Sequence, residues 1–189
     1  MNIFKKIYYH LYPRETDGLI KEAKKYLNLK VDVQTVFDVG SRDCEQSVEF
    51  HEHFPSASIF AFEANPQTVP ICEKIAANYD NITVIPKAVN DYDGTCTFFQ
   101  IDTENYSASP IPKSYKNKEI LYKAGGSSLI KHAHFDVGKG LNTKAVDVNC
   151  TRLDSFCTAN KISTVDILWM DLEGAEFKAL QSLGPAISK

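Results

Sequence analysis

Apolar runs typical of buried strands alternate with helical segments along this chain, and this rhythm constrains its fold more than any other feature. The strand-like runs span residues 33–39, 58–64 and 82–89, and the helical segments span residues 45–54 and 65–79. Gly40 ends the first run, and Asn65 and Pro66 are typical of the first residues of a helix. Strands that alternate with helices at this spacing predict right-handed crossovers and a parallel sheet, so the predicted fold class is α/β.

The second half of the chain departs from this rhythm. Residues 95–101 and 144–150 have the pattern of two more strands, which we expect to form an inserted β-hairpin. Residues 103–126 are polar and rich in proline and glycine, and connections of this length are usually functional lids or disordered segments. We interpret them as a mobile lid on the substrate side. A strand pattern returns at residues 165–172, and a helix is predicted at residues 175–183.

The beginning of the chain is predicted to be helical. Residues 1–12 and 19–27 place apolar side chains at helical spacing, and we expect residues 1–30 to pack as a helical segment on the core formed by residues 31–189. Two lysines in the first helix leave open a weak peripheral contact with an anionic membrane surface. No apolar run approaches the roughly 20 residues that a membrane-spanning helix requires, so no transmembrane segment is expected.

Charge and cysteine content narrow the partners and the compartment. Lysine and arginine number 21 against 24 aspartates and glutamates, a balance that gives no electrostatic basis for general nucleic-acid binding. The cysteines are Cys44, Cys72, Cys96, Cys150 and Cys157. Their odd number, wide spacing and lack of a CxxC pair predict reduced thiols, no metal site and a cytoplasmic location.

Polar residues and a glycine follow the first two predicted strands. Ligands of open α/β sheets bind beyond the carboxyl ends of the strands, so these positions are candidates for a binding site. Asp38 lies at the end of the first strand, and Gly40 permits a tight turn and a close backbone approach to a nucleoside or amino-acid ligand. Glu63 ends the second strand, where a carboxylate can accept hydrogen bonds from both hydroxyls of a ribose.

The residues after Gly40 separate two cofactor classes. Dinucleotide binding requires G-x-G-x-x-G, and only Gly40 of that pattern is present. Asp43 and Glu45 at the start of the next helix would repel a pyrophosphate, whereas S-adenosylmethionine has no phosphate and carries a sulfonium cation and an amino group. The two acids also have a purely structural interpretation, since acids near a helix N-terminus complement its dipole.

Four strings, DVGSRDC, FEANP, IPKAVND and DILWMDLEGAEFKAL, occur in this order between residues 33 and 184 and resemble the successive motifs of FkbM-type methyltransferases. The resemblance implies a Rossmann-like class I methyltransferase sheet of seven strands and S-adenosyl-L-methionine as the cofactor. It places Asp38 and Gly40 beside the methionine part, Glu63 on the ribose, and residues 87–89 near the adenine. The cofactor-binding residues expected on this basis are Asp38, Gly40, Ser41, Asp43, Glu63, Ala64, Lys87 and Ala88.

Residues 126–129 also resemble a family motif, and the chain departs from the family pattern at three positions. Cys44 stands where a glycine is usual, Ala64 where a proline is common, and Trp169 where many members have lysine.

The resemblance implies O-methylation of a hydroxyl on a sugar, glycan or small molecule. A hydroxyl acceptor must lose a proton, and Asp171 at the end of the last predicted strand is our candidate to orient the acceptor and take that proton. Glu173 is the second candidate, and His132, which lies in the insert with His134, is a third. Capping of the following helix is the alternative role for Asp171 and Glu173.

A second hypothesis is a non-catalytic S-adenosylmethionine-binding or partner subunit that another chain completes. The strand at residues 165–172 would need a neighbour on its outer side, and the sequence contains no further strand after it. We therefore expect either a truncated domain that lacks its C-terminal strands or an association that covers this edge, which leaves homo-oligomerisation open.

Overall fold

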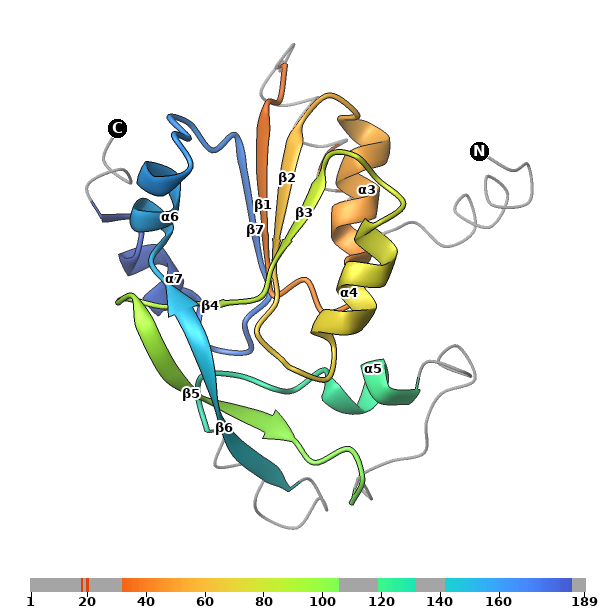
Figure 1. Ribbon diagram of the computed structural model, residues 1–189, viewed down its shortest axis with the longest axis vertical. Helices are drawn as coiled ribbons and strands as arrows, with labels where there is room; N and C mark the ends of the chain where they lie inside the picture. Colours follow the sequence, from red (N-terminus) through yellow and green to blue (C-terminus); the bar gives the residue numbers. More distant parts are fainter. Residues whose placement is uncertain (1–17, 19, 21–31, 106–118, 132–141, 185–189) are drawn as a thin grey trace.

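The computed structural model describes residues 18, 20, 32–105, 119–131 and 142–184 (Figure 1). The helices predicted over residues 1–12 and 19–27 lie outside the described residues, except for two isolated positions. Within the described residues, no helix combines the length and apolar character needed to cross a bilayer.

The central sheet has four parallel strands in the order β3-β2-β1-β7, which confirms the α/β prediction. These strands are β1 (Thr35–Val39), β2 (Ser58–Phe62), β3 (Ile82–Ile85) and β7 (Ile167–Met170). In this register Asp38 pairs with Ala61 on one side and with Trp169 on the other. The carboxyl ends of β1, β2 and β7 therefore lie next to one another at one edge of the sheet.

Helices cover both faces of this sheet (Figure 1). They are α3 (Glu45–His53) and α4 (Val69–Ala76) on one face, and α6 (Leu153–Ala159) and α7 (Glu176–Gln181) on the other. Alternate side chains of β1 enter the two apolar layers: Val36 packs with Phe50 of α3, whereas Phe37 packs edge-to-face on Phe156 of α6. This alternation on a fully covered strand is why β1 has a continuous apolar sequence.

A second, smaller sheet lies beside the carboxyl edge of the first (Figure 1). It contains β4 (Ala88–Val89), β6 (Thr143–Thr151) and β5 (Gly94–Ile101), in that order. β5 and β6 pair antiparallel along their length, as expected for the inserted hairpin. The connection between them contains α5 (Glu119–Ala124), while residues 106–118 and 132–141 lie outside the described residues. The mobility of the lid stays a prediction.

Two boundaries differ from the prediction for local reasons. The helix expected from Asn65 begins at Val69, because the Asn65 side chain accepts a hydrogen bond from the Gln67 N–H and shapes a turn first. The strand expected over residues 82–89 divides into β3 and β4 at Pro86, which has no N–H to donate to a ladder. α6 had no counterpart in the sequence prediction.

The prediction that all five cysteines are reduced thiols is wrong for two of them. Cys44 and Cys72 form a disulfide with their Cα atoms 5.3 Å apart. They are 28 residues apart in sequence, but the crossover from β1 through α3 to β2 places the turn after β1 against α4. Cys96, Cys150 and Cys157 are free, as predicted. Disulfides are typical of oxidising compartments, so the cysteines no longer support the cytoplasmic location, which stays a prediction.

Candidate active site

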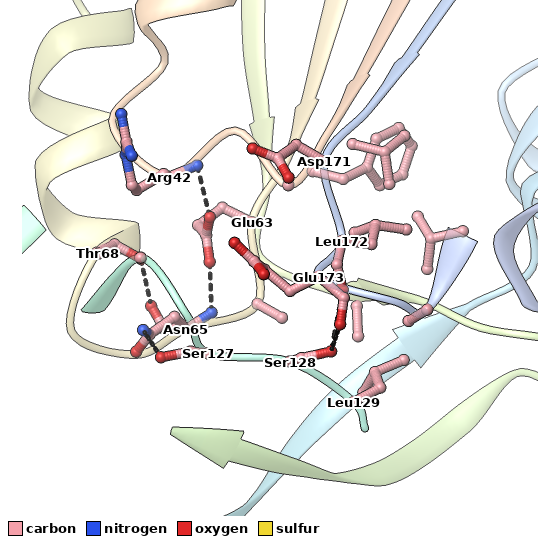
Figure 2. Close-up of a pocket in the computed structure, with 18 of the residues that line it drawn as sticks. Arg42, Glu63, Asn65, Thr68, Ser127, Ser128, Leu129, Asp171, Leu172 and Glu173 are labelled. Carbon is pink, nitrogen blue, oxygen red and sulfur yellow. Dashed lines mark hydrogen bonds between the residues drawn. The ribbon is translucent and has the colours of Figure 1, made fainter. Parts of the chain in front are cut away.

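A cavity of about 350 Å³ opens at the carboxyl ends of β1, β2 and β7 (Figure 2). Residues 124–125 and 127–129 of the insert and Phe98 of β5 close it from the side of the smaller sheet. The volume lies within the range of small-molecule sites, and the position is the one at which open α/β sheets bind ligands.

The turn at Gly40 brings three strand ends together. Gly40 has a φ of 92°, and its N–H donates to the carbonyl of Phe62 at 2.9 Å. A Cβ atom at this position would overlap the carbonyl oxygen of Asp171, at the end of β7. Glycine is therefore required here by the close approach of β1 to β7, in addition to any approach to a ligand.

Glu63 is held rigidly at the cavity wall (Figure 2). Its side chain is buried; Oε2 accepts the N–H of Arg42 at 2.6 Å, and Oε1 accepts the N–H of Asn65 at 2.6 Å. A carboxylate has about four acceptor sites, and these two N–H groups occupy two of them. Burial raises the pKa of Glu63, and the bonds from Asn65 and Arg42 oppose this effect by favouring the charged form.

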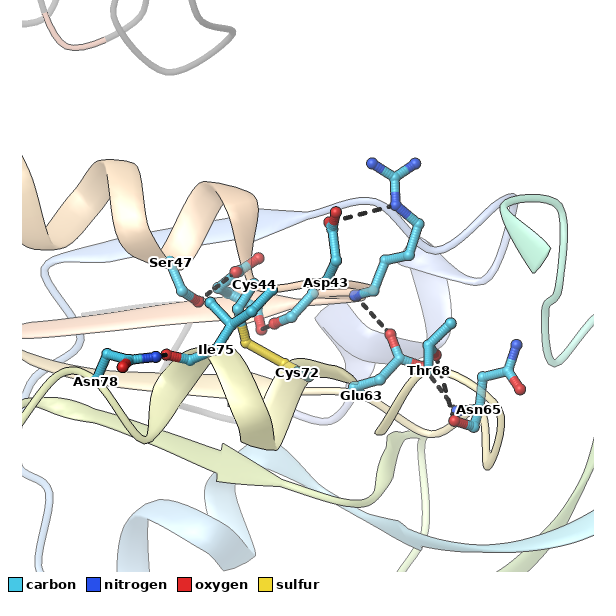
Figure 3. The surroundings of a disulfide bond; sticks show 12 residues. Asp43, Cys44, Ser47, Glu63, Asn65, Thr68, Cys72, Ile75 and Asn78 are labelled. Atoms are coloured by element: carbon cyan, nitrogen blue, oxygen red, sulfur yellow. Dashed lines mark hydrogen bonds and ion pairs between the residues drawn. A yellow bond between two sulfur atoms is a disulfide. The ribbon is translucent and has the colours of Figure 1, made fainter. Parts of the chain in front are cut away.

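The loop between β1 and α3, whose Arg42 N–H binds Glu63 (Figure 3), contains two non-glycine residues with a positive φ. Arg42 and Cys44 have φ values of 48° and 57°, in the left-handed region that favours glycine. The positive φ of Cys44 fits the glycine that the family resemblance implies at this position. Here the disulfide to Cys72 anchors that position to α4.

Three expected cofactor residues lie beneath the turn and do not line the cavity. Asp38 is almost fully buried, and its Oδ2 accepts the Ser47 hydroxyl at 2.5 Å. Burial raises the pKa of Asp38 to about 6. Ser41 donates to the carbonyl of Asp38, and Asp43 lies 3.5 Å from the Arg42 guanidinium. These contacts shape the loop, and direct binding of a cofactor by these residues stays a prediction.

The acids after β7 divide between capping and the cavity. Glu176 Oε1 accepts the N–H groups of Leu172 at 2.9 Å and Gly174 at 3.4 Å, so this side chain supports the turn before α7. Asp171 and Glu173 are exposed and line the cavity (Figure 2). Glu173 has a φ of 50°, a strained value of the kind that clusters at functional sites.

Comparison with known proteins identifies the family. The model of the methyltransferase FkbM domain matches residues 38–189, most of the chain. The chain belongs to the FkbM methyltransferase family.

A 2-O-methyltransferase is similar to part of this chain. The 2-O-methyltransferase NoeI of Sinorhizobium fredii (strain NBRC 101917 / NGR234) is 24% identical over 145 residues, which are 75% of this chain and 54% of that protein. The chain therefore spans about half the length of this relative.

The remaining expected cofactor residues of this FkbM domain meet at the cavity. Gly40, Glu63, Ala64, Lys87 and Ala88 all line it, together with apolar atoms of Phe98 and Leu129. Ala64, Ala88, Phe98 and Leu129 also belong to one apolar cluster, which gives the cavity a hydrophobic end. His132 lies outside the described residues, so its role stays a prediction.

The sequence interpretation missed several lining residues of this FkbM domain: Arg42, Glu49, Asn65, Thr68, Phe98, Ser127 and Ser128. Asn65 lies in the FEANP string, and the two serines lie in the motif at residues 126–129, so the signal for these three was present. Phe98 carried no such signal, because only the folded hairpin places it at the cavity.

Proposed function

We propose that this FkbM domain binds S-adenosylmethionine in the cavity and transfers its methyl group to a hydroxyl of a sugar, glycan or small molecule. The observation that carries the proposal is Glu63, a buried carboxylate fixed by two backbone N–H groups with acceptor capacity directed at the cavity. Such a group is suited to the two hydroxyls of a ribose.

The charges of the cavity fit this cofactor. The acidic lining residues are Glu45, Glu49, Glu63, Asp171 and Glu173, against Arg42 and Lys87 as the basic ones. Excess negative charge favours a ligand with a sulfonium and an ammonium group and disfavours a dinucleotide pyrophosphate. The apolar end formed by Ala88, Phe98 and Leu129 suits a flat purine.

When bound, S-adenosylmethionine supplies an activated methyl group, so the protein need not provide a nucleophile of its own. The protein must instead align the acceptor, exclude water and accept a proton. Asp171 is our first candidate for the proton acceptor, because it ends β7 beside Gly40, and Glu173 is the second. A positioned base contributes a factor of roughly 100 to 10,000 in rate. The relative NoeI is a 2-O-methyltransferase, which supports a hydroxyl as the acceptor.

Calorimetry with S-adenosylmethionine tests the proposal. The wild-type chain should bind, and Glu63→Ala should weaken binding by roughly 100-fold or more, since two hydrogen bonds to a charged group are lost. Glu104→Ala is a matched control, because Glu104 is an exposed glutamate that pairs with Lys144 outside the cavity lining. Absence of binding to the wild type, or equal affinities for Glu63→Ala and wild type, would contradict the assignment.

A further inference from the structure

Two consecutive serines of the insert contact opposite sides of the cavity (Figure 2). Ser127 forms its contacts on the side of the cavity that β2 provides. Its Oγ accepts the N–H of Ile101 at 3.0 Å and the side-chain amide of Asn65 at 3.3 Å. Asn65 in turn donates its backbone N–H to Glu63. Ser127 is therefore one residue removed from the carboxylate that the proposed cofactor site depends on.

Ser128 forms its contacts on the side of the cavity that β7 provides. Its Oγ lies 2.9 Å from the carbonyl oxygen of Leu172 and 3.2 Å from that of Glu173, and it accepts the N–H of Ile130 at 3.1 Å. Ser128 is itself buried, and its backbone exchanges two hydrogen bonds with Phe99 of β5. The hydroxyl is thus fixed by the smaller sheet and reaches across to the end of β7.

The backbone that Ser128 contacts needs such support. Glu173 is a non-glycine residue with a φ of 50°, and Gly174 follows with a φ of 99°. A left-handed conformation at a side chain this large persists only when its surroundings hold it. The Ser128 hydroxyl binds the carbonyls of Leu172 and Glu173, so it helps to keep the Glu173 carboxylate at the cavity.

We propose that the two serines are positioning residues with separate tasks, an inference that rests on the proposed function. Ser127, through Asn65, sets the Glu63 carboxylate for the cofactor. Ser128 holds Glu173 on the acceptor side. Neighbouring positions of one short segment thereby tie the insert to both halves of the site, the cofactor half at β2 and the acceptor half at β7.

The two tasks predict opposite results for two alanine variants. In calorimetry with S-adenosylmethionine, Ser127→Ala should weaken binding roughly tenfold, because one hydrogen bond that positions Asn65, and through it Glu63, is lost. The affinity of Ser128→Ala should stay within about twofold of the wild-type affinity. In hydrogen exchange, Ser128→Ala should accelerate the amides of Leu172 and Gly174 and leave Asn65 unchanged. Ser127→Ala should accelerate exchange of the Asn65 amide and leave the amides of Leu172 and Gly174 unchanged.

Ser155→Ala is the matched control, because it removes a hydroxyl that donates to Asp93 outside the cavity lining, and it should change neither readout. If an alanine variant does not fold, the corresponding cysteine variant keeps the side-chain volume with a weaker hydrogen-bonding group and must show the same split. Equal effects of the two serine substitutions on both readouts would overturn the inference, since a general structural role moves them together. Wild type that does not bind S-adenosylmethionine would overturn the proposed function as well, whereas binding without the split overturns the inference alone.

Discussion

Gly40 and Asp38 are two residues apart at the end of β1, and each is constrained by what lies next to it. For Gly40 the constraint is steric, since a side chain would overlap the Asp171 carbonyl and the φ of 92° disfavours any other residue. Gly40→Ala should therefore lower the free energy of unfolding by at least about 2 kcal/mol.

Gly94 is the control for this prediction. It also has a positive φ, 137°, but no atom lies within 4 Å of a Cβ there. Gly94→Ala should cost only about 1 kcal/mol. Urea unfolding measures both, and equal losses would contradict the packing argument.

For Asp38 the constraint is electrostatic. Burial raises its pKa from 3.8 to about 6, so the folded protein retains a proton that the unfolded chain has released. The stability associated with this group is fully present below about pH 3.8 and is lost as the pH rises through about 6. Asp38→Asn cannot ionise. Relative to wild type, its free energy of unfolding should therefore increase by about 3 kcal/mol between pH 3.5 and 7.

Urea titrations across this pH range check the Asp38 prediction. Asp80→Asn, at an exposed aspartate, is the control for the substitution itself. A difference between Asp38→Asn and wild type that stays constant from pH 3.5 to 7 would show that Asp38 does not titrate as a buried group.

At the scale of elements, the disulfide joins the loop before α3 to α4 on one face of the central sheet (Figure 3). A cross-link that closes 28 residues restricts the unfolded chain and should contribute about 3 to 4 kcal/mol. Cys72→Ser should lose this amount, and a dithiol reductant should lower wild-type stability to a similar level without affecting the variant. Cys157→Ser, at a free and partly buried cysteine, is the control for substitution alone. Wild-type stability that is equal with and without reductant would count against this contribution.

The sequence predicted most elements of the central sheet because the spacing of apolar residues, and the glycines and prolines that end an element, are local properties. β1, β2 and β7 were expected within a few residues of their observed bounds, and so was the α3 helix. Errors arose where a tertiary partner decided the outcome. Residues 88–89 left the third strand because β6 was available to pair with them, and the seven residues of α6 are too few to show a helical period.

The candidate site was predictable only in part for the same reason. Gly40, Glu63 and Asp171 follow strands, and the topology of a parallel sheet brings such positions to one edge, where the structure places all three. The serine contacts depend on how the insert folds back over that edge. The disulfide depends on a crossover that brings α4 to the loop, and spacing in the sequence does not reveal it.

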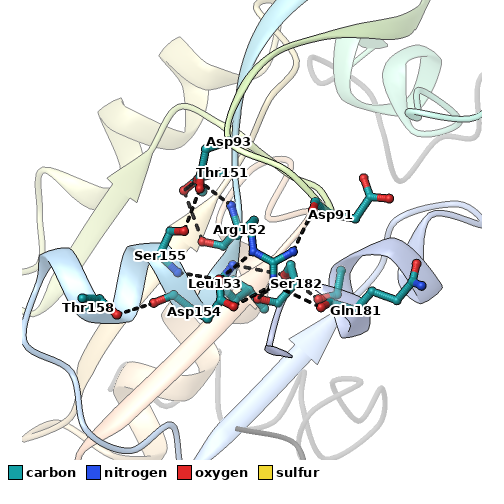
Figure 4. Close-up of polar contacts among 11 residues, drawn as sticks. Asp91, Asp93, Thr151, Arg152, Leu153, Asp154, Ser155, Thr158, Gln181 and Ser182 are labelled. Atoms are coloured by element: carbon teal, nitrogen blue, oxygen red, sulfur yellow. Dashed lines mark hydrogen bonds and ion pairs between the residues drawn. The ribbon is translucent and has the colours of Figure 1, made fainter. Parts of the chain in front are cut away.

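A polar cluster joins α6, α7 and the turn before β5 (Figure 4). Arg152 forms two bonds to Asp154, at 2.8 and 2.6 Å, and donates to the carbonyl of Asp91 at 2.7 Å. Asp93 accepts from the Arg152 N–H and from the Ser155 hydroxyl. The smaller sheet, which carries one wall of the cavity, is thereby fixed to the helices that cover the larger sheet.

Ser182, at the end of α7, is a fully buried member of this cluster. Its hydroxyl accepts the N–H of Leu153 at 3.1 Å and donates to the carbonyl of Ala179, while its carbonyl accepts the N–H of Asp154. Ser182→Ala leaves the buried Leu153 N–H without its acceptor and should lower the free energy of unfolding by about 1 to 3 kcal/mol. Ser155→Ala, which removes a half-buried hydroxyl from the same cluster without leaving a buried N–H unpaired, should cost less, about 0.5 to 1 kcal/mol. Because the Ser182 contacts join α6 to α7 away from the cavity lining, Ser182→Ala should bind S-adenosylmethionine as wild type does while it remains folded.

Thermal unfolding followed with and without the cofactor measures the stability and the cofactor binding of Ser182→Ala. An unchanged unfolding midpoint for Ser182→Ala would show that this cluster does not hold α6 and α7 together.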